Sequence, residues 1–488
     1  MLTSFKNLKK FQLSEYILLA LFAFSIPFSW RIATYVMMVL FANVILRGVF
    51  EEGFKPNQLQ QKHKFVYLIF IAFWAIYAIS FLYSENSAEA RVQIGKKLSF
   101  LLFPLYFLFS NLSYLTKERV RTIMYCFVFG ILALYIVNLV WAGYDVVFEE
   151  AKKTRFFEPD FLKLGTGYIH HSYISIYTCI SVAFCFAEAF TNRRTIYFNV
   201  LSIIVLILFT IISKSRAGLL CMAMTFFILW IWLTFVQKKK VLGLSVGVIM
   251  ISVVVLTFVF FQNSVKRITE TLSNLQNIEK QDRRIGITIG YKNLLIDKFW
   301  FGVGAGDRGD ETLKSYIKKM EEIVQRIKPR DNYYSDTFVQ EREDCLESIR
   351  KKYGGTLNNN TFKYAKEMSE KYNCDYNSVR ENLATYINVN VAINSECNAH
   401  NQFSDTIIAV GLIGLLLFIS MFLSPIYLWI KNKNFDIVFF SLLIIIAFNS
   451  LFESVLERQM GIMFFVFFYM LLFHGVFCQQ TTDNEQQT

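Results

Sequence analysis

A histidine and an asparagine stand next to each other where a polar stretch of the sequence meets an apolar one. His400 and Asn401 come just before the apolar run 407–418. Histidine accepts protons near neutral pH, so His400 is a candidate general base for a hydroxyl group. Asn401 has a structural alternative, because asparagine side chains cap the free N–H groups at the start of a helix. Capping explains the asparagine and leaves the histidine without a role.

Three arginines are candidate anion-binding residues. Arg216 lies between two apolar runs, and Arg283 and Arg284 open the amphipathic segment 285–299. A guanidinium group keeps its charge and offers a planar set of donors that suits phosphate, so these side chains could bind a diphosphate. The structural alternatives are an interfacial arginine at a helix end for Arg216 and a solvated helix start for the other two. Position and spacing alone favour these alternatives.

Gly302, Gly304 and Gly306 form a short glycine-rich sequence after that segment. It differs from a dinucleotide-binding fingerprint in its spacing, and it follows a helix where the fingerprint follows a strand. We expect instead a tight turn whose backbone approaches a helix or a lipid headgroup. Asp307 and Asp310 follow the turn, and two lone carboxylates are weak evidence for a metal site.

Two further polar groups flank apolar runs. His170 and His171 precede one of them. Adjacent residues point about 100° apart on a helix, so these two are poorly placed to share a metal ion, although one of them could face a common cavity. Glu453, Glu457 and Arg458 precede the last apolar run. Charges in such places usually face the bundle interior, and we expect ion pairs among them or with the arginines above.

Membrane-spanning helices must position these residues. Hydrophobic residues make up 54% of the chain, which contains 51 phenylalanines, and the mean hydropathy is +0.38. A membrane span needs about 20 mainly apolar residues. We therefore expect an all-α polytopic membrane protein with about twelve transmembrane helices. The spans are expected at approximately 14–29, 31–50, 65–83, 98–113, 121–143, 168–190, 196–212, 217–236, 241–261, 404–430, 435–452 and 460–478.

The net charge of +12 does not indicate a nucleic acid partner. The long polar loop between spans nine and ten is nearly neutral, whereas basic residues gather in short connectors such as 238–240. This positive-inside pattern predicts cytoplasmic termini and an external loop. The expected organisation is spans at 1–262, the loop at 263–402, spans at 403–478 and a disordered tail at 479–488. The loop comprises helices with the glycine turn at 263–330 and a polar helical insert at 331–397. Its Cys345, Cys374 and Cys397 could form one disulfide, whose pairing stays open.

Taken together, these motifs resemble the O-antigen ligase and O-antigen polymerase superfamily of bacterial surface-polysaccharide enzymes. The matching residues are 215–218, Arg284 with 301–306, 399–403 with 410–414, and 452–454. The resemblance implies a helical membrane bundle in the bacterial inner membrane with a periplasmic loop. It also implies an inverting, metal-independent glycosyl transfer that needs no cofactor and uses an undecaprenyl-diphosphate-linked glycan as donor. By position, Arg216, Arg284 and His400 correspond to the catalytic arginines and histidine.

The chemistry of these residues agrees with such a transfer. Arginines in a water-poor cavity would stabilise the departing diphosphate, and His400 would take the proton of the acceptor hydroxyl. The candidate substrate-binding residues are Arg283, Asn401, His171, Gly304, Gly306 and Glu453. A ligase would use lipid A–core as acceptor, a polymerase another lipid-linked glycan, and a related enzyme a protein hydroxyl. A transporter or flippase would favour inverted repeats and charges at mid-membrane, and neither is evident.

Overall fold

The computed structural model describes residues 9–52, 58–148, 171–212, 216–260, 294, 296, 298–309, 311 and 401–478. These residues form helices and turns, without a β-strand among them, which confirms the expected all-α class for the described part. The chain divides into two compact units. The first comprises Met1–Ala78, Val92–Gln262 and Leu416–Thr488, and the second comprises Ile79–Arg91 and Asn263–Leu415. Most of the expected loop, including its three cysteines, lies outside the described residues.

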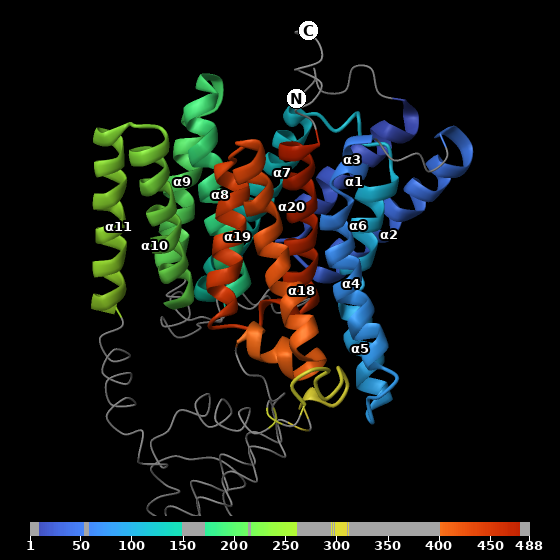
Figure 1. Ribbon diagram of the computed structural model, residues 1–488. Helices are drawn as coiled ribbons and strands as arrows, with labels where there is room; N and C mark the ends of the chain where they lie inside the picture. Colours follow the sequence, from blue (N-terminus) through green and yellow to red (C-terminus); the bar gives the residue numbers. More distant parts are fainter. Residues whose placement is uncertain are drawn as a thin grey trace, which may run out of the picture. The chain divides into compact units, whose positions relative to one another are not determined.

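The described helices are labelled in chain order (Figure 1). Their bounds are α1 Lys10–Ser25, α2 Trp30–Arg47, α3 Gln58–Lys62, α4 Lys64–Ser80, α5 Ser87–Lys96, α6 Ser99–Phe109, α7 Lys117–Phe148, α8 His171–Thr191, α9 Ile196–Ile212, α10 Arg216–Ile231, α11 Lys240–Phe260, α18 Gln402–Asn432, α19 Ile437–Ser450 and α20 Gln459–Phe477. Each expected span overlaps one of these helices. Short π-helical turns extend α2 and α10, at Gly48–Glu52 and Trp232–Val236.

The described helices are those of a multi-pass membrane protein. Among the described residues, 8 helices are long and apolar enough to cross a membrane, and shorter apolar helices occur at Lys64–Ser80, Lys240–Val255 and Ile437–Ser450. The number of crossings and the side of the membrane on which the loop lies stay predictions.

Helix α20 is the centre of the first unit. Its apolar window is 100% buried, against 28% for α2 and α9, whose outer faces are left for lipid. A helix that is apolar all round needs neighbours on every side. Aromatic side chains of α20 reach α1, α7 and α4, with ring centroids 4.8 Å apart for Phe467–Phe22 and 4.6 Å apart for Phe468–Phe127 and Tyr469–Phe70. The many phenylalanines are therefore packed between helices as well as exposed to lipid.

Helix α5 was not expected as a separate element. Asn86 accepts a hydrogen bond from the N–H group of Glu89 at 3.1 Å and so caps the start of α5. The charged residues of α5 make this segment too polar to be recognised as a span from hydropathy. Helix α5 nevertheless continues through a turn at Lys97 into the apolar α6. Helix α7 is longer than its expected span of 121–143, because its charged first turn begins at Lys117 and its last turn reaches Phe148.

Candidate functional site

The glycine turn docks on α18 through its backbone, inside the second unit. Helix α18 is interrupted at Gly411, which has φ 72° and ψ −169°. The N–H group of Val303 donates to the carbonyl oxygen of Ile408 at 2.7 Å, and that of Gly304 donates to Ala409 at 3.0 Å. An uninterrupted helix would pair these carbonyl groups internally. The turn thus satisfies backbone groups that the interruption of α18 releases.

Glycine is required on both sides of this contact. Gly302 and Gly411 each have φ 72°, a left-handed conformation that other residues rarely adopt. A Cβ atom on Gly302 would lie 2.5 Å from the carbonyl oxygen of Ile408, and one on Gly411 would lie 2.1 Å from that of Trp300. A side chain at either position would therefore separate the two segments. The close approach of the turn to a helix agrees with the tight turn expected from the sequence.

Asp307 fixes the other side of the glycine turn to the corner between α4 and α5. Its two carboxylate oxygens accept hydrogen bonds from the N–H groups of Glu85 at 2.8 Å and Asn86 at 2.7 Å. The hydroxyl oxygen of Ser84 also accepts a hydrogen bond from the N–H group of Gly306, at 3.3 Å. Asp307 is buried, so these partners replace water around its charge. The carboxylate therefore serves as an anchor for backbone N–H groups.

The start of α18 is tied to the same turn by a second charged residue. Arg308 lies 3.2 Å from the fully buried carboxylate of Asp405. Asn401 accepts a hydrogen bond from the N–H group of Ser404 at 3.0 Å and so caps α18, as the structural alternative predicted. A cap and an ion pair thus fix the first turn of α18 within the second unit.

In the first unit, the start of α8 is fastened to the start of α20. The hydroxyl group of Tyr173 donates to the carbonyl oxygen of Val455 at 3.3 Å, and that of Tyr177 donates to Met460 at 3.2 Å. A Cβ atom on Gly461 would lie 2.0 Å from the carbonyl oxygen of Val455, which shows how closely the chain packs there. These contacts fix the turn that precedes α20.

Two candidate residues begin helices at this end of the first unit. His171 is the first residue of α8 and Arg216 is the first residue of α10. Helix α8 packs against α10 and α19, and α8 and α10 run in the same direction because α9 returns between them (Figure 1). Both starts therefore lie at one end of the bundle, together with the turn before α20. The structure describes neither of these two side chains.

A buried ion pair supports the turn before α20. The ammonium group of Lys97 lies 3.2 Å from both carboxylate oxygens of Glu457, and the two side chains are 0% and 7% exposed. The ring of Tyr77 lies 4.4 Å from the same ammonium group, which adds a cation–π contact. The sequence predicted an ion pair for Glu457 but did not predict Lys97 as the partner. The sequence alone did not distinguish Lys97 from the other basic residues that flank apolar runs.

The turn itself presents charged groups at the end of the bundle. Residues Val455–Glu457 form one turn of 3-10 helix, and Arg458 is the N-cap residue of α20. Arg458 is exposed and Glu453 is half-buried. Buried and half-buried charges in membrane proteins usually mark a wet cavity or a substrate path. The exposed Arg458 leaves a positive charge at this end of the first unit.

The candidate residues fall into three sets. Arg283, Arg284 and His400 lie outside the described residues, and His171 and Arg216 are placed by their backbone alone. Asn401, Gly304, Gly306 and Glu453 are described in full. The first three of these belong to the second unit and Glu453 to the first. Contact of any of them with substrate stays a prediction.

Several positioning residues escaped the sequence analysis. Asp307 was considered only as weak evidence for a metal site, and the pair Arg308–Asp405 was not considered. Gly411 gave a weak signal, because a glycine inside an apolar helical run lowers helix stability and often has a packing reason. The partners of such residues are distant in the sequence, so only the fold reveals them.

Comparison with known proteins finds a similarity in the central part of the chain. The sequence model of the family described as O-antigen ligase matches residues 200–340, less than a third of the chain. The matched segment contains Arg216, Arg283, Arg284 and the glycine turn, and it ends before His400. None of the curated proteins matches the sequence. This match confirms the resemblance that the motifs indicated: residues 200–340 are similar to the O-antigen ligase family.

Proposed function

We propose that the protein is an O-antigen ligase of the bacterial inner membrane. It would transfer a polysaccharide en bloc from undecaprenyl diphosphate to a sugar hydroxyl of lipid A–core at the periplasmic face. The family match across residues 200–340 carries this proposal, because that segment contains all three candidate arginines. The multi-pass helical structure supports it, since a lipid-linked donor must be reached from within the membrane.

The proposed reaction is a single displacement. The acceptor hydroxyl oxygen attacks the anomeric carbon as the bond from that carbon to the diphosphate oxygen breaks, which inverts the configuration. The electron pair leaves with undecaprenyl diphosphate, where Arg216 and Arg284 stabilise the developing charge. His400 takes the proton of the attacking hydroxyl, a contribution of about 10²–10⁴-fold in rate. Arg283, His171 and Glu453 would bind the charged and hydroxyl groups of the substrates.

The second unit would hold the candidate base in position. Helix α18 begins at Gln402, directly after the candidate base and its neighbour Asn401. Asn401 caps this helix, and the pair Arg308–Asp405 holds its first turn to the glycine turn. A catalytic group loses efficiency when its position varies by about 1 Å, so a rigid mount serves the reaction.

The test is transfer by the purified full-length protein from a labelled lipid-linked polysaccharide to lipid A–core. Arg216→Ala, Arg284→Ala and His400→Ala are each expected to lower the turnover by at least about 100-fold. Arg194→Ala is the matched control, because Arg194 is exposed in the turn between α8 and α9. The proposal fails if all three variants, folded and equally abundant, transfer glycan at the rate of the control.

The acceptor distinguishes a ligase from a polymerase, which would use the same leaving group. Deletion in the native host followed by gel analysis of lipopolysaccharide separates the two. Loss of all long chains with accumulation of lipid-linked polymer supports a ligase. A core that carries a single repeat unit identifies a polymerase, and glycan movement across vesicles without a new glycosidic bond identifies a transporter.

A further inference from the structure

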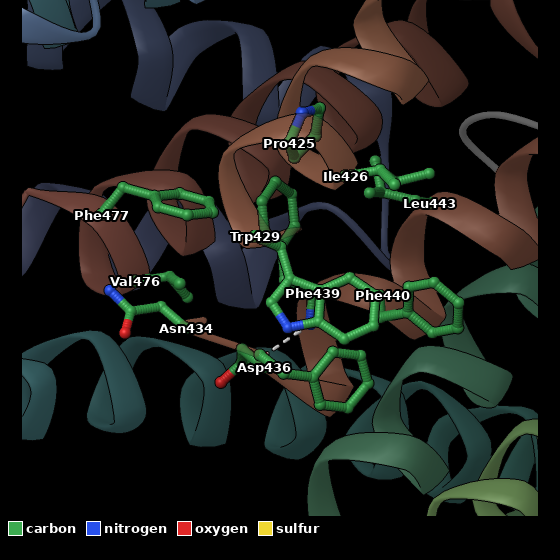
Figure 2. A pocket seen from close by; sticks show the side chains of 11 residues that line it. Pro425, Ile426, Trp429, Asn434, Asp436, Phe439, Phe440, Leu443, Val476 and Phe477 are labelled. Atoms are coloured by element: carbon green, nitrogen blue, oxygen red, sulfur yellow. Dashed lines mark hydrogen bonds between the residues drawn. The ribbon is translucent and has the colours of Figure 1, made fainter. Parts of the chain in front are cut away.

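A crevice opens in the first unit where α18 and α20 end and α19 begins (Figure 2). It is lined by residues of all three helices and of the loop between α18 and α19. None of its lining residues is a candidate for glycan transfer. The crevice lies at the far end of α20 from the Lys97–Glu457 pair, so it needs a separate explanation.

The walls of the crevice are aromatic and aliphatic. Trp429 of α18 packs on Phe435 with ring centroids 4.4 Å apart, and Phe435 packs on Phe440 at 5.4 Å. Pro425 and Leu443 line the apolar part of the crevice. Tryptophan and other aromatic residues at the end of a membrane helix commonly lie at the level of lipid headgroups. An apolar crevice at this depth is suited to the upper part of a lipid chain.

A carboxylate stands at the polar side of the same crevice. Asp436 accepts a hydrogen bond from the N–H group of Phe439 at 2.8 Å and caps α19. Asp436 and Asn434 lie on one side of the Trp429 indole (Figure 2). Among the described residues, no lysine or arginine comes within ion-pair distance of Asp436, although Lys117 attracts it from farther away. A carboxylate has several lone pairs, so the cap leaves acceptor capacity for a cation.

Basic residues stand near another wall of the crevice. The ring of His63 lies 6.1 Å from that of Phe477, which lines the crevice. Burial lowers the pKa of His63, and the charges of Lys62 and Lys431 lower it further. Lys62 is the neighbour of His63 in the chain, Lys431 lies in the last turn of α18, and both are exposed. Their ammonium groups are available to a phosphate at the membrane surface.

We infer that the crevice binds a zwitterionic phospholipid whose headgroup ends in a primary ammonium group. The ammonium group contacts the carboxylate of Asp436 and the face of Trp429. The phosphate lies toward Lys431 and Lys62, and the start of an acyl chain lies along Pro425. An anionic headgroup without an ammonium group would face the charge of Asp436 without compensation. A purely cationic ligand would leave the lysines without a partner.

The experiment measures lipid binding to the detergent-solubilised full-length protein by native mass spectrometry. Phosphatidylethanolamine and phosphatidylglycerol with identical acyl chains are titrated separately. The wild-type protein is expected to bind phosphatidylethanolamine about tenfold more tightly, the size of one hydrogen bond between charged groups. Equal binding of the two lipids, or a preference for phosphatidylglycerol, overturns the inference.

Two variants test the contact with the ammonium group and the contact with the phosphate separately. Asp436→Asn keeps a residue that caps helices well and removes the charge, so the protein should fold while the preference for phosphatidylethanolamine disappears. Lys431→Gln should weaken the binding of both lipids and leave the preference. Glu118→Gln is the matched control, because it removes an exposed carboxylate from the first turn of α7, outside the crevice. A preference that persists in Asp436→Asn contradicts the assignment of the ammonium site.

Discussion

The ammonium group of Lys97 lies 3.2 Å from both carboxylate oxygens of Glu457, and both side chains are buried. The pair joins the turn between α5 and α6 to the turn before α20. Two residues 360 positions apart in the sequence thus determine how one end of the first unit is closed. A buried pair of this kind contributes little net stability, but the loss of one partner leaves an unpaired charge.

The first prediction follows from this asymmetry. Lys97→Met should destabilise the protein by about 3–5 kcal/mol, because the carboxylate of Glu457 stays buried without a counter-charge. The double variant Lys97→Met/Glu457→Gln should recover most of that loss. Arg194→Met is the control, since Arg194 is exposed in the turn between α8 and α9 and its replacement should change the stability by no more than about 0.5 kcal/mol. Thermal unfolding in detergent measures all three, and equal melting temperatures for the two single variants would contradict the prediction.

Asp307 is predicted to govern the local stability of the glycine turn. Asp307→Asn replaces one accepting oxygen by a donor that faces a backbone N–H group, at a cost of about 1–3 kcal/mol. Hydrogen exchange should then accelerate in peptides that cover 79–91 and 298–309, while α20 keeps its protection. Glu85→Gln is the control, because the side chain of Glu85 is exposed and its N–H bond to Asp307 is retained. Unchanged exchange in Asp307→Asn would show that the anchor is dispensable.

The fold was predictable to the extent that it depends on runs of apolar residues. Each expected span overlaps a helix, since a run of about 20 apolar residues is long enough to form a membrane-spanning helix. Lys97, Asp307 and Asp405 were not predictable, because a charge becomes informative only when its distant partner and its burial are known. Gly411 lies between these cases, since a glycine in an apolar run suggests a packing reason but does not reveal that Trp300 is the residue approached. The arginines and the histidine were found from residue type and order, and their contacts stay predictions.

Gly411 is predicted to be the least replaceable residue of the second unit. Gly411→Ala must hold an alanine at φ 72° with its Cβ atom 2.1 Å from the carbonyl oxygen of Trp300. The strained backbone alone costs about 1–3 kcal/mol, and the clash displaces the glycine turn as well. Gly309→Ala is the control, because a Cβ atom at Gly309 meets nothing within 4 Å. The two variants are compared by hydrogen exchange at 298–309 and by glycan transfer, and equal behaviour would contradict the prediction.

Substitutions of Asn401 can distinguish its role as the cap of α18 from a contact with substrate. Asn401→Ala removes the oxygen that accepts from Ser404 and should destabilise the start of α18 by about 0.5–2 kcal/mol. Asn401→Ser restores a capping oxygen on a shorter side chain, so hydrogen exchange at 402–410 should match the wild-type protein.

If Asn401 also binds substrate, as expected from the sequence, Asn401→Ser still lacks the amide group, and its KM for the glycan donor or acceptor should rise. The measurement is steady-state transfer by folded Asn401→Ser protein beside the wild-type protein. A wild-type KM in Asn401→Ser, together with a defect in Asn401→Ala, would restrict Asn401 to the capping of α18. The assignment of substrate contacts would then pass to His400, the neighbouring residue whose chemistry a cap does not explain.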